Sequence, residues 1–175
     1  MKIQMIKKLG IVSCLAVACA VVSPSVVRAQ PNAGFILFGG AKDSALDYCL
    51  DNGNSGRSDR YYLEVKPQKF KVSEVIIIYP DHFTGSFDTS EIKLRVTDQC
   101  SGGKDLEIES ATWDKETRLI TIIPKEAIPS KTALRVVMAN VRNPNFSGFY
   151  QFDGRVLRAD IPVPVYIGSW VITLD

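Results

Sequence analysis

The sequence has little of what most enzyme sites are built from. Its 175 residues include a single histidine, His82, and three methionines, and no G-x-S-x-G stretch that would place a nucleophilic serine on a sharp turn. A catalytic triad needs a base, a nucleophile and an orienting group, and a copper site needs several His and Met side chains. We therefore expect a protein that is not an enzyme and that holds no cofactor.

Long apolar runs are missing beyond the first thirty residues. The stretch 9–22 is uncharged and follows three lysines, but its fourteen residues are fewer than the roughly 20 that a membrane-spanning helix needs. Small residues around Ala29 offer the pattern that a signal peptidase recognises. We predict a cleaved secretory signal peptide over 1–29 and one domain over 30–175, with no transmembrane anchor after cleavage.

A concentrated positive charge is also absent. Four of the 21 Lys and Arg residues precede residue 30, whereas all 19 Asp and Glu residues follow it, so 17 basic residues face 19 acidic ones and the predicted mature net charge is −2. Nucleic acids and anionic lipids require a clustered basic stripe. We expect neither as a partner.

Cysteine is scarce and its placement fits export. Two of the four cysteines lie in the leader, which leaves Cys49 and Cys100, with no C-x-x-C pair. The sequence predicts one structural disulfide between them, which would stabilise by roughly 4 kcal/mol for a loop of about 50 residues; two free thiols are the alternative. A lipoprotein anchored at Cys19 is not expected, because Ala16 stands where a lipobox has Leu, Val or Ile.

What the chain does have is the two-residue periodicity of strands. In the stretch 92–97 (IKLRVT), apolar and polar residues alternate, as in a strand with one wet face, and 61–65 (YYLEV) behaves similarly. The stretches 74–80 and 117–124 are almost continuous apolar runs, which are typical of central strands covered on both faces. Seven to nine short strands predict an all-β fold, an antiparallel sandwich of immunoglobulin-like or Greek-key type.

The segment 43–60 is the exception to the strand pattern. Apolar residues four apart allow at most one short helix near 43–52, and a loop rich in turn formers follows. An EF-hand is excluded, because Tyr62 stands where the loop needs a bidentate glutamate. An irregular calcium site remains an alternative, and its candidate ligands are Asp47, Asp51 and Asp59.

The stretch 140–154 (NVRNPNFSGFYQFDG) combines asparagines with aromatic residues. Asn143-Pro144-Asn145 is strong turn chemistry, and Tyr150 then shares one face of the next strand with Phe152. We interpret the segment as a corner followed by a core strand. Arg142 has two open interpretations: its guanidinium binds loop carbonyls at the corner, or it faces a partner.

These residues also resemble a known family. From Tyr61 onward the chain carries YYLEVKP, VIIIYP and ETRLITIIPKEAIPSKTALRVVMANVRNP, and it ends with YIGSW. The most specific part is the turn that contains Arg142, Asn143, Pro144, Gly148 and Tyr150. Together they resemble the cyanobacterial exported proteins grouped as domain of unknown function 2808. The cysteine-bearing stretch 42–60 departs from the family pattern, which makes the disulfide a subgroup feature.

The resemblance implies an exported β-sandwich in the periplasm or the thylakoid lumen, with release to the medium as a further destination, and it implies no activity. We predict an interaction or structural module that binds an unidentified protein partner in one of these compartments. A small-ligand or calcium-binding module using the 43–60 loop is the alternative. A hydrolase is a remote third, because its acid-base chemistry would rest on His82 alone.

Overall fold

Backbone pairing organises the chain into strands from Tyr48 to the C-terminal end. The computed structural model describes residues 44–97, 99 and 102–175, which belong to one compact unit. These residues form ten strands and one 3-10 turn: β1 (Tyr48–Leu50), β2 (Ser58–Val65), β3 (Val72–Ile78), η1 (Thr89–Glu91), β4 (Ile92–Val96), β5 (Lys104–Leu106), β6 (Ile108–Asp114), β7 (Leu119–Pro124), β8 (Leu134–Arg142), β9 (Gly148–Arg158) and β10 (Pro164–Leu174).

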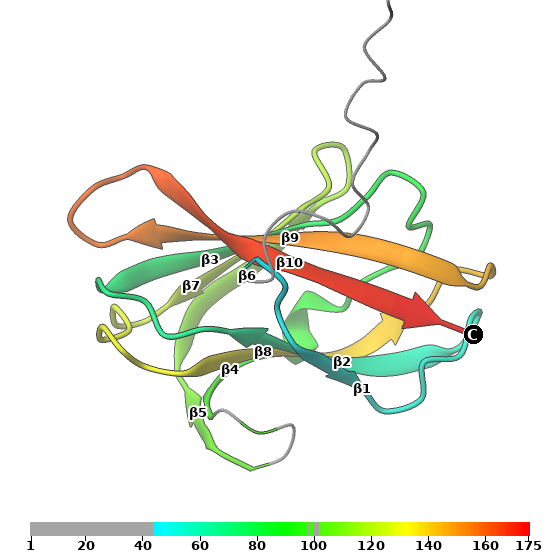
Figure 1. Ribbon diagram of the computed structural model, residues 1–175, viewed down its shortest axis with the longest axis horizontal. Helices are drawn as coiled ribbons and strands as arrows, with labels where there is room; N and C mark the ends of the chain where they lie inside the picture. The colour runs from blue at the N-terminus through cyan, green and yellow to red at the C-terminus, as the bar shows by residue number, and fades with distance from the viewer. Residues whose placement is uncertain (1–43, 98, 100–101) are drawn as a thin grey trace, which may run out of the picture. The chain divides into compact units, whose positions relative to one another are not determined.

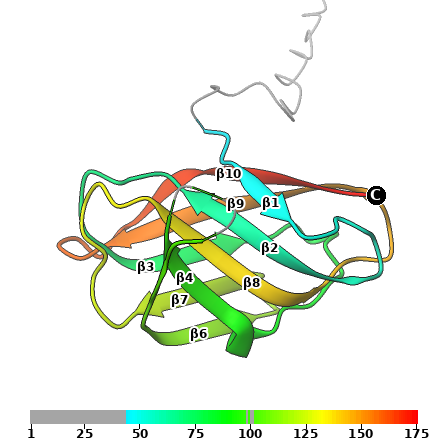
Figure 2. The same ribbon diagram turned by 90° about the horizontal axis from the view of Figure 1, so that it is seen from below.

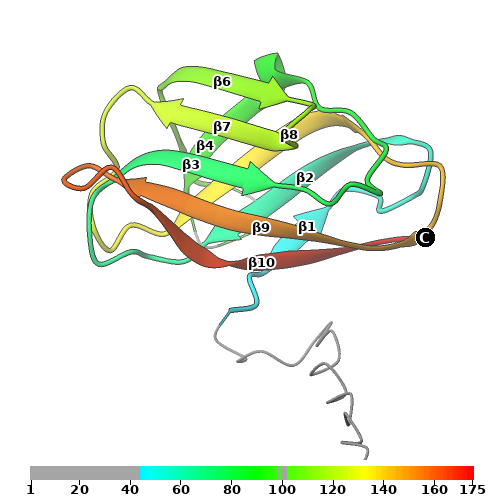
Figure 3. The same ribbon diagram turned by 90° about the horizontal axis from the view of Figure 1, so that it is seen from above.

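The strands form two five-stranded sheets that pack face to face. The first sheet has the order β1-β2-β8-β4-β5 and the second the order β10-β9-β3-β7-β6, with antiparallel pairing throughout. Figure 1 shows the two layers from the side, while Figure 2 shows the first sheet from outside and Figure 3 the second. The predicted antiparallel β-sandwich is therefore confirmed.

Alternation along the strands decides which side chains enter the core. In β4, Ile92 and Leu94 are buried and Lys93 between them is exposed. In β9, Tyr150 is buried in the same way, whereas the neighbouring Phe149 is 59% exposed on the outer face. Burial of apolar area contributes roughly 25 cal/mol per Å², so a one-residue slip of either strand would cost several kcal/mol.

Both tryptophans have packing roles. Trp170 is fully buried and its indole N–H donates to the Glu64 carbonyl at 2.9 Å. The Trp113 indole N–H donates to the Tyr79 hydroxyl, also at 2.9 Å. Each ring thus fills core volume while its one polar atom is satisfied, as is common for buried tryptophan.

The two continuous apolar runs do form neighbouring interior strands, β3 and β7. Val75 and Ile77 of β3 are fully buried, but Ile76 and Ile78 on the outer face are only partly buried. The expectation that both faces of these strands are fully covered is therefore wrong for the outer face, which is only partly buried. The cross-strand partners of Ile76 are Thr121 and Arg155, whose methyl group and long side chain leave it partly covered without a second layer.

The short helix that the sequence allowed at 43–52 is not formed. Residues 48–50 make β1, which pairs with β2 through Cys49 and Tyr62. Tyr48 and Leu50, two residues apart, both pack against the core. Pairing with an existing strand satisfies backbone groups and buries this face at once, which outweighs the weak helical preference of two turns.

The same segment covers the free edge of β10. Leu46 N–H donates to the Ser169 carbonyl at 2.9 Å, and Ser169 N–H donates to Ser44 at 2.8 Å. Further along, the Tyr48 hydroxyl accepts from Thr173 N–H at 3.0 Å. An eleven-residue edge strand would otherwise present a row of unpaired groups to other chains. Within the part of the chain that the structure describes, no helix has the length and apolar character needed to cross a bilayer.

Candidate functional site

Two loops that are distant in the sequence meet at one corner of the sandwich. The loop between β1 and β2 covers residues 51–57, and the connection between β8 and β9 covers 143–147. Gly56 N–H donates to the Pro144 carbonyl at 2.7 Å, and Asn143 N–H donates to the Arg57 carbonyl at 2.9 Å. The C-terminal residue joins the same corner, since Asp175 N–H donates to Gly53 at 2.9 Å. The corner is held by backbone hydrogen bonds on several sides.

A buried polar cluster lies beneath this corner. The Asp59 carboxylate accepts the N–H groups of Asn52, Gly53 and Arg60 at 3.0, 2.7 and 2.7 Å. The carboxylate thus fixes the course of the 51–57 loop by replacing the water that these donors would otherwise bind. Asp59 itself is only 5% exposed, so this carboxylate is part of the interior and not of the loop surface.

Asn143 completes the cluster. Its amide donates to the Asn54 carbonyl at 2.8 Å and to the Asp59 carboxylate at 3.3 Å, and its carbonyl oxygen accepts from the Tyr61 hydroxyl at 2.7 Å. Burial, and secondarily the charge of Asp59, raise the pKa of Tyr61 well above its usual range. The Tyr61 hydroxyl therefore remains a neutral donor, and each polar atom of the Asn143 side chain has a partner.

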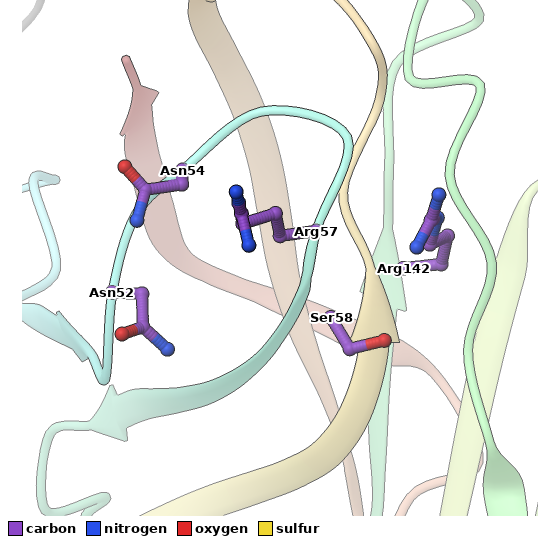
Figure 4. A pocket seen from close by; sticks show the side chains of 5 residues that line it. All are labelled: Asn52, Asn54, Arg57, Ser58 and Arg142. Carbon is purple, nitrogen blue, oxygen red and sulfur yellow. The ribbon is translucent and has the colours of Figure 1, made fainter.

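An open polar pocket of about 580 Å³ lies at the same corner, and Figure 4 shows the side chains that line it. Its side chains all carry hydrogen-bond donors and none is acidic: Asn52, Asn54, Arg57, Ser58 and Arg142. In Figure 4 the Arg57 side chain extends toward Asn54, the Arg142 side chain lies on the other side of the β8 segment, and Ser58 lies between the two. Ser58 and Arg142 are register partners across β2 and β8, which fixes their spacing.

The structure does not support the first interpretation of Arg142, and that Arg142 faces a partner stays a prediction. Its backbone exchanges two hydrogen bonds with Ser86, at 3.0 and 2.8 Å, whereas its side chain is exposed and makes no hydrogen bond or ion pair with any described residue. The Arg57 side chain is likewise exposed and unpaired among the described residues. The guanidinium of Arg142 does not bind loop carbonyls, and both arginines are available to a ligand.

The three candidate calcium ligands do not come together. Asp59 is engaged by backbone N–H groups, Asp51 forms an ion pair with Arg60 at 3.5 Å, and Asp47 is exposed. Asp51 and Asp59 line one small pocket of about 180 Å³, which Asp47 does not reach. Across residues 44–97, 99 and 102–175 no group of three His, Cys, Asp or Glu side chains could hold a metal ion.

The remaining residues of the family-marking turn support the corner. Pro144 is buried and supplies the carbonyl that Gly56 N–H uses, and Gly148 opens β9 with a φ of 153°. The Tyr150 hydroxyl donates to the Phe146 carbonyl at 2.7 Å, and burial raises the pKa of Tyr150. The interpretation of 140–154 as a corner followed by a core strand agrees with this arrangement.

His82 lies at a separate, exposed position. Its Nδ1 is 3.3 Å from the Asp81 carboxylate, a contact that lowers the pKa of Asp81, and its ring stacks on Tyr150 with centroids 5.3 Å apart. No hydroxyl or thiol of a described residue is hydrogen-bonded to His82. A nucleophile–base pair is therefore not assembled there.

The structure describes only one of the two cysteines of the predicted disulfide. Cys49 lies in β1 opposite Tyr62, with its neighbours Tyr48 and Leu50 packed on the core. Cys100 lies outside the described residues, so the pairing of Cys49 with Cys100 stays a prediction.

Sequence reasoning missed four of the five pocket residues, namely Asn52, Asn54, Arg57 and Ser58, and it missed the burial of Asn143. The available signal was weak: Arg57 ends one loop and Arg142 immediately precedes the other, and each loop contains two asparagines. That these loops meet depends on the pairing of β2 with β8, which local periodicity does not reveal.

Comparison with solved structures finds sandwich domains of low sequence identity. BslA, a bacterial hydrophobin, has 11% identity and a TM-score of 0.49 over 78% of this chain and 97% of its own. An uncharacterised Nocardia farcinica protein with an immunoglobulin-like fold has 10% identity and a TM-score of 0.43, over 74% and 97% of the two chains. The collagen-binding domain of a Staphylococcus aureus adhesin has 11% identity and a TM-score of 0.41, over 74% and 95%. At these values the likenesses carry no argument about what this chain binds.

Comparison with curated proteins finds no match. In contrast, the family model described as "Protein of unknown function (DUF2808)" matches residues 35–174, which include every strand of the described residues and both loops of the corner. The family expected from the turn at Arg142, Asn143 and Pro144 is thereby confirmed, and the chain belongs to the DUF2808 family of proteins of unknown function.

Proposed function

We propose that this protein is an exported, non-enzymatic β-sandwich that binds another component of the cell envelope or the thylakoid lumen. The observation that carries the proposal is the corner pocket, whose side chains are all donors and include two unpaired guanidinium groups. The one hydroxyl among them, that of Ser58, has no histidine or carboxylate beside it in the lining to act as a general base of the kind that hydrolases use. A site that offers recognition groups without an activated nucleophile suits binding.

Export remains part of the proposal, and so does origin in a cyanobacterium. The leader over 1–29 supports export, and cleavage after Ala29 would leave Gln30 as the first residue. Fractionation of the source cells, with N-terminal sequencing of the recovered protein, tests the compartment and the cleavage site. We expect Gln30 at the start of a protein found in the periplasm or the lumen; an intact Met1 on protein from the cytoplasm would contradict export.

Binding is tested by affinity capture from envelope and lumenal fractions. The exported protein, with Cys49 and Cys100 oxidised as isolated, is coupled to a resin through its lysines, because no lysine lies in either loop of the corner. We expect a protein or glycan to be retained, and retention to fall when Arg57 and Arg142 are both changed to Ala. A monodisperse protein that retains nothing from either fraction would contradict the proposed function.

The calcium-binding alternative receives no support from the corner, because Asp59 is used to hold the loop. Thermal-shift measurement with calcium and other divalent ions is the direct test. Without a rise in Tm the alternative is removed, whereas a rise that depends on Asp51 and Asp47 would restore it.

A further inference from the structure

We propose that the corner pocket binds acidic sugars: Arg57 and Arg142 each bind a carboxylate or sulfate group on the glycan, and the Asn and Ser side chains bind its hydroxyls. This inference rests on the proposed binding function and specifies its ligand. It assigns a role to the side chain of Arg142. This residue belongs to the family-marking turn, but among the described residues only its backbone forms hydrogen bonds.

Neither guanidinium of the pocket forms an ion pair with a carboxylate of the described residues. Of the carboxylates at the corner, Asp59 is occupied by backbone N–H groups and Asn143, and Asp51 by Arg60. Asp175 bonds to the 51–57 loop through its backbone and does not line the pocket. A guanidinium without a counter-charge favours a planar oxoanion, which it can bind through two parallel hydrogen bonds. A cation is disfavoured, because no lining side chain is acidic.

The other lining groups match sugar hydroxyls. Asn52 and Asn54 each present an amide that donates and accepts, and the Ser58 hydroxyl does both. The same corner carries Phe146, which is 76% exposed and follows Asn145. Asn145 in turn lies close to the 51–57 loop, since a Cβ placed on Gly56 would lie 3.2 Å from its Oδ1. An exposed ring beside polar groups offers a face for the C–H side of a pyranose.

The site is also built in advance of binding. Asp59 and Asn143 hold the backbone at Asn52, Gly53 and Asn54 from below. The backbone of Arg142 is held by two hydrogen bonds to the backbone of Ser86. Only the side chains have to become ordered when a ligand binds, which lowers the entropic cost of binding.

Other macromolecules fit the corner less well. A peptide that adds a strand needs a free sheet edge, but β2 lies between β1 and β8, and β8 lies between β2 and β4. Nucleic acid needs a broad basic surface, whereas residues 30–175 carry two more acidic than basic side chains. A lipid tail needs an apolar cavity, and each lining side chain here is polar.

The test is calorimetric titration of the exported protein with defined probes: a polyuronate hexasaccharide, a sulfated hexasaccharide, a neutral glucan hexasaccharide, hexaglutamate and inorganic phosphate. We expect at least one acidic hexasaccharide to bind and the neutral glucan not to bind. Arg57→Ala and Arg142→Ala should each weaken binding about tenfold or more, because hydrogen bonds to charged groups contribute about 1.5–3 kcal/mol.

Matched variants separate recognition from folding. Arg155→Ala removes an exposed, unpaired arginine from the outer face of β9 and should leave affinity unchanged. Arg142→Lys keeps the charge but loses the bidentate geometry, so we expect an intermediate affinity. Phe146→Ala should weaken hexasaccharide binding more than phosphate binding. The Tm of each arginine variant should equal that of the wild type.

Several results would overturn the inference. These are no binding of either acidic hexasaccharide, binding that survives both arginine substitutions, and hexaglutamate or phosphate binding as tightly as the sugars. If the affinity resin still retains a partner when the hexasaccharides fail to bind, the proposed binding function stands and only the sugar assignment falls.

Discussion

Two polar clusters lie along the same pair of strands, β2 and β8, and they are satisfied very differently. Near the corner, Asn143 and Asp59 bond to each other and to loop backbone. Further along, Arg135 of β8 is fully buried and pairs with Glu64, its register partner on β2. The Nε and Nη1 atoms of Arg135 have no hydrogen-bond partner among the residues that the structure describes.

The difference is one of charge and of partner number. The Asn143 side chain is neutral and each of its polar atoms has a hydrogen-bond partner, so its burial costs little free energy. Its hydrogen bonds also order the 51–57 loop. Arg135 carries a full charge, and a single carboxylate, itself 24% exposed, compensates it. A buried ion pair contributes little net stability, but loss of one partner leaves an expensive uncompensated charge. We therefore expect the two clusters to respond differently to substitution.

The largest effect should follow removal of the Arg135 partner. Glu64→Ala leaves a fully buried guanidinium without a counter-charge, and we expect the free energy of unfolding to fall by about 3–5 kcal/mol in urea titrations. Glu107→Ala is the matched control, since Glu107 pairs with Lys125 at the exposed surface and should change stability by less than about 1 kcal/mol. Equal effects of the two substitutions would contradict the comparison.

Removal of the buried charge should reverse most of that loss. In the double variant Glu64→Ala/Arg135→Met, an unbranched apolar side chain fills the arginine's place and no charge remains buried. We expect it to recover about 3 kcal/mol relative to Glu64→Ala in the same titration. A double variant no more stable than Glu64→Ala would mean that Arg135 contributes through packing and not through its charge.

The corner cluster should respond to loss of its amide. Asn143→Ala leaves the Tyr61 hydroxyl, the Asn54 carbonyl and one Asp59 oxygen short of a partner, and we expect a loss of about 2 kcal/mol. Asn145→Ala, two residues away and exposed, should be nearly neutral. Hydrogen exchange of the Asn52 and Gly53 amides should accelerate in the first variant alone; unchanged exchange would show that Asn143 does not order the loop.

The smallest effect concerns alkaline pH. The pKa of Tyr61 is raised in the folded protein above its ordinary value of 10.0, so the unfolded chain loses this proton first and stability falls as pH rises above about 10. One pH unit above that point, the loss from this group is about 1.4 kcal/mol. Tyr61→Phe should remove this part of the pH dependence in unfolding curves at pH 8 to 11; an identical slope in both proteins would contradict it.

Most of the fold was predictable because the strands alternate between two environments. In 92–97 the pattern of apolar and polar residues matches the burial of Ile92 and Leu94. Arg135 shows where this rule fails, since alternation along β8 directs it to the outer face as a solvated residue, yet it is fully buried. Periodicity specifies a face of the sheet and does not specify whether that face is covered. Likewise, β1 forms through its partner strand, not through local preference.

The candidate site was predictable only in part, for the same reason. The turn at Asn143 and Pro144 is local chemistry and was read from the sequence, whereas the approach of Arg57 to that turn depends on strand pairing across more than 80 residues. The amide of Asn143 was expected at a corner, but its burial against Asp59 is a tertiary property. Residues that form a local turn were identified from the sequence. The pocket was missed because it depends on contacts between segments that are distant in the sequence.

The order of strands in each sheet has a consequence for folding. Leu63 of β2 pairs with Val136 of β8, and Ile76 of β3 pairs with Arg155 of β9, so central partners are more than 70 residues apart in the chain. Closing such long loops before any contact forms makes folding slow. β3 can pair with β7 earlier, but β2 and β4 have no interior neighbour until β8 has been synthesised, and β3 lacks its second neighbour until β9 follows. For a chain that we propose to be exported, this topology keeps both sheets incomplete until its last third has emerged.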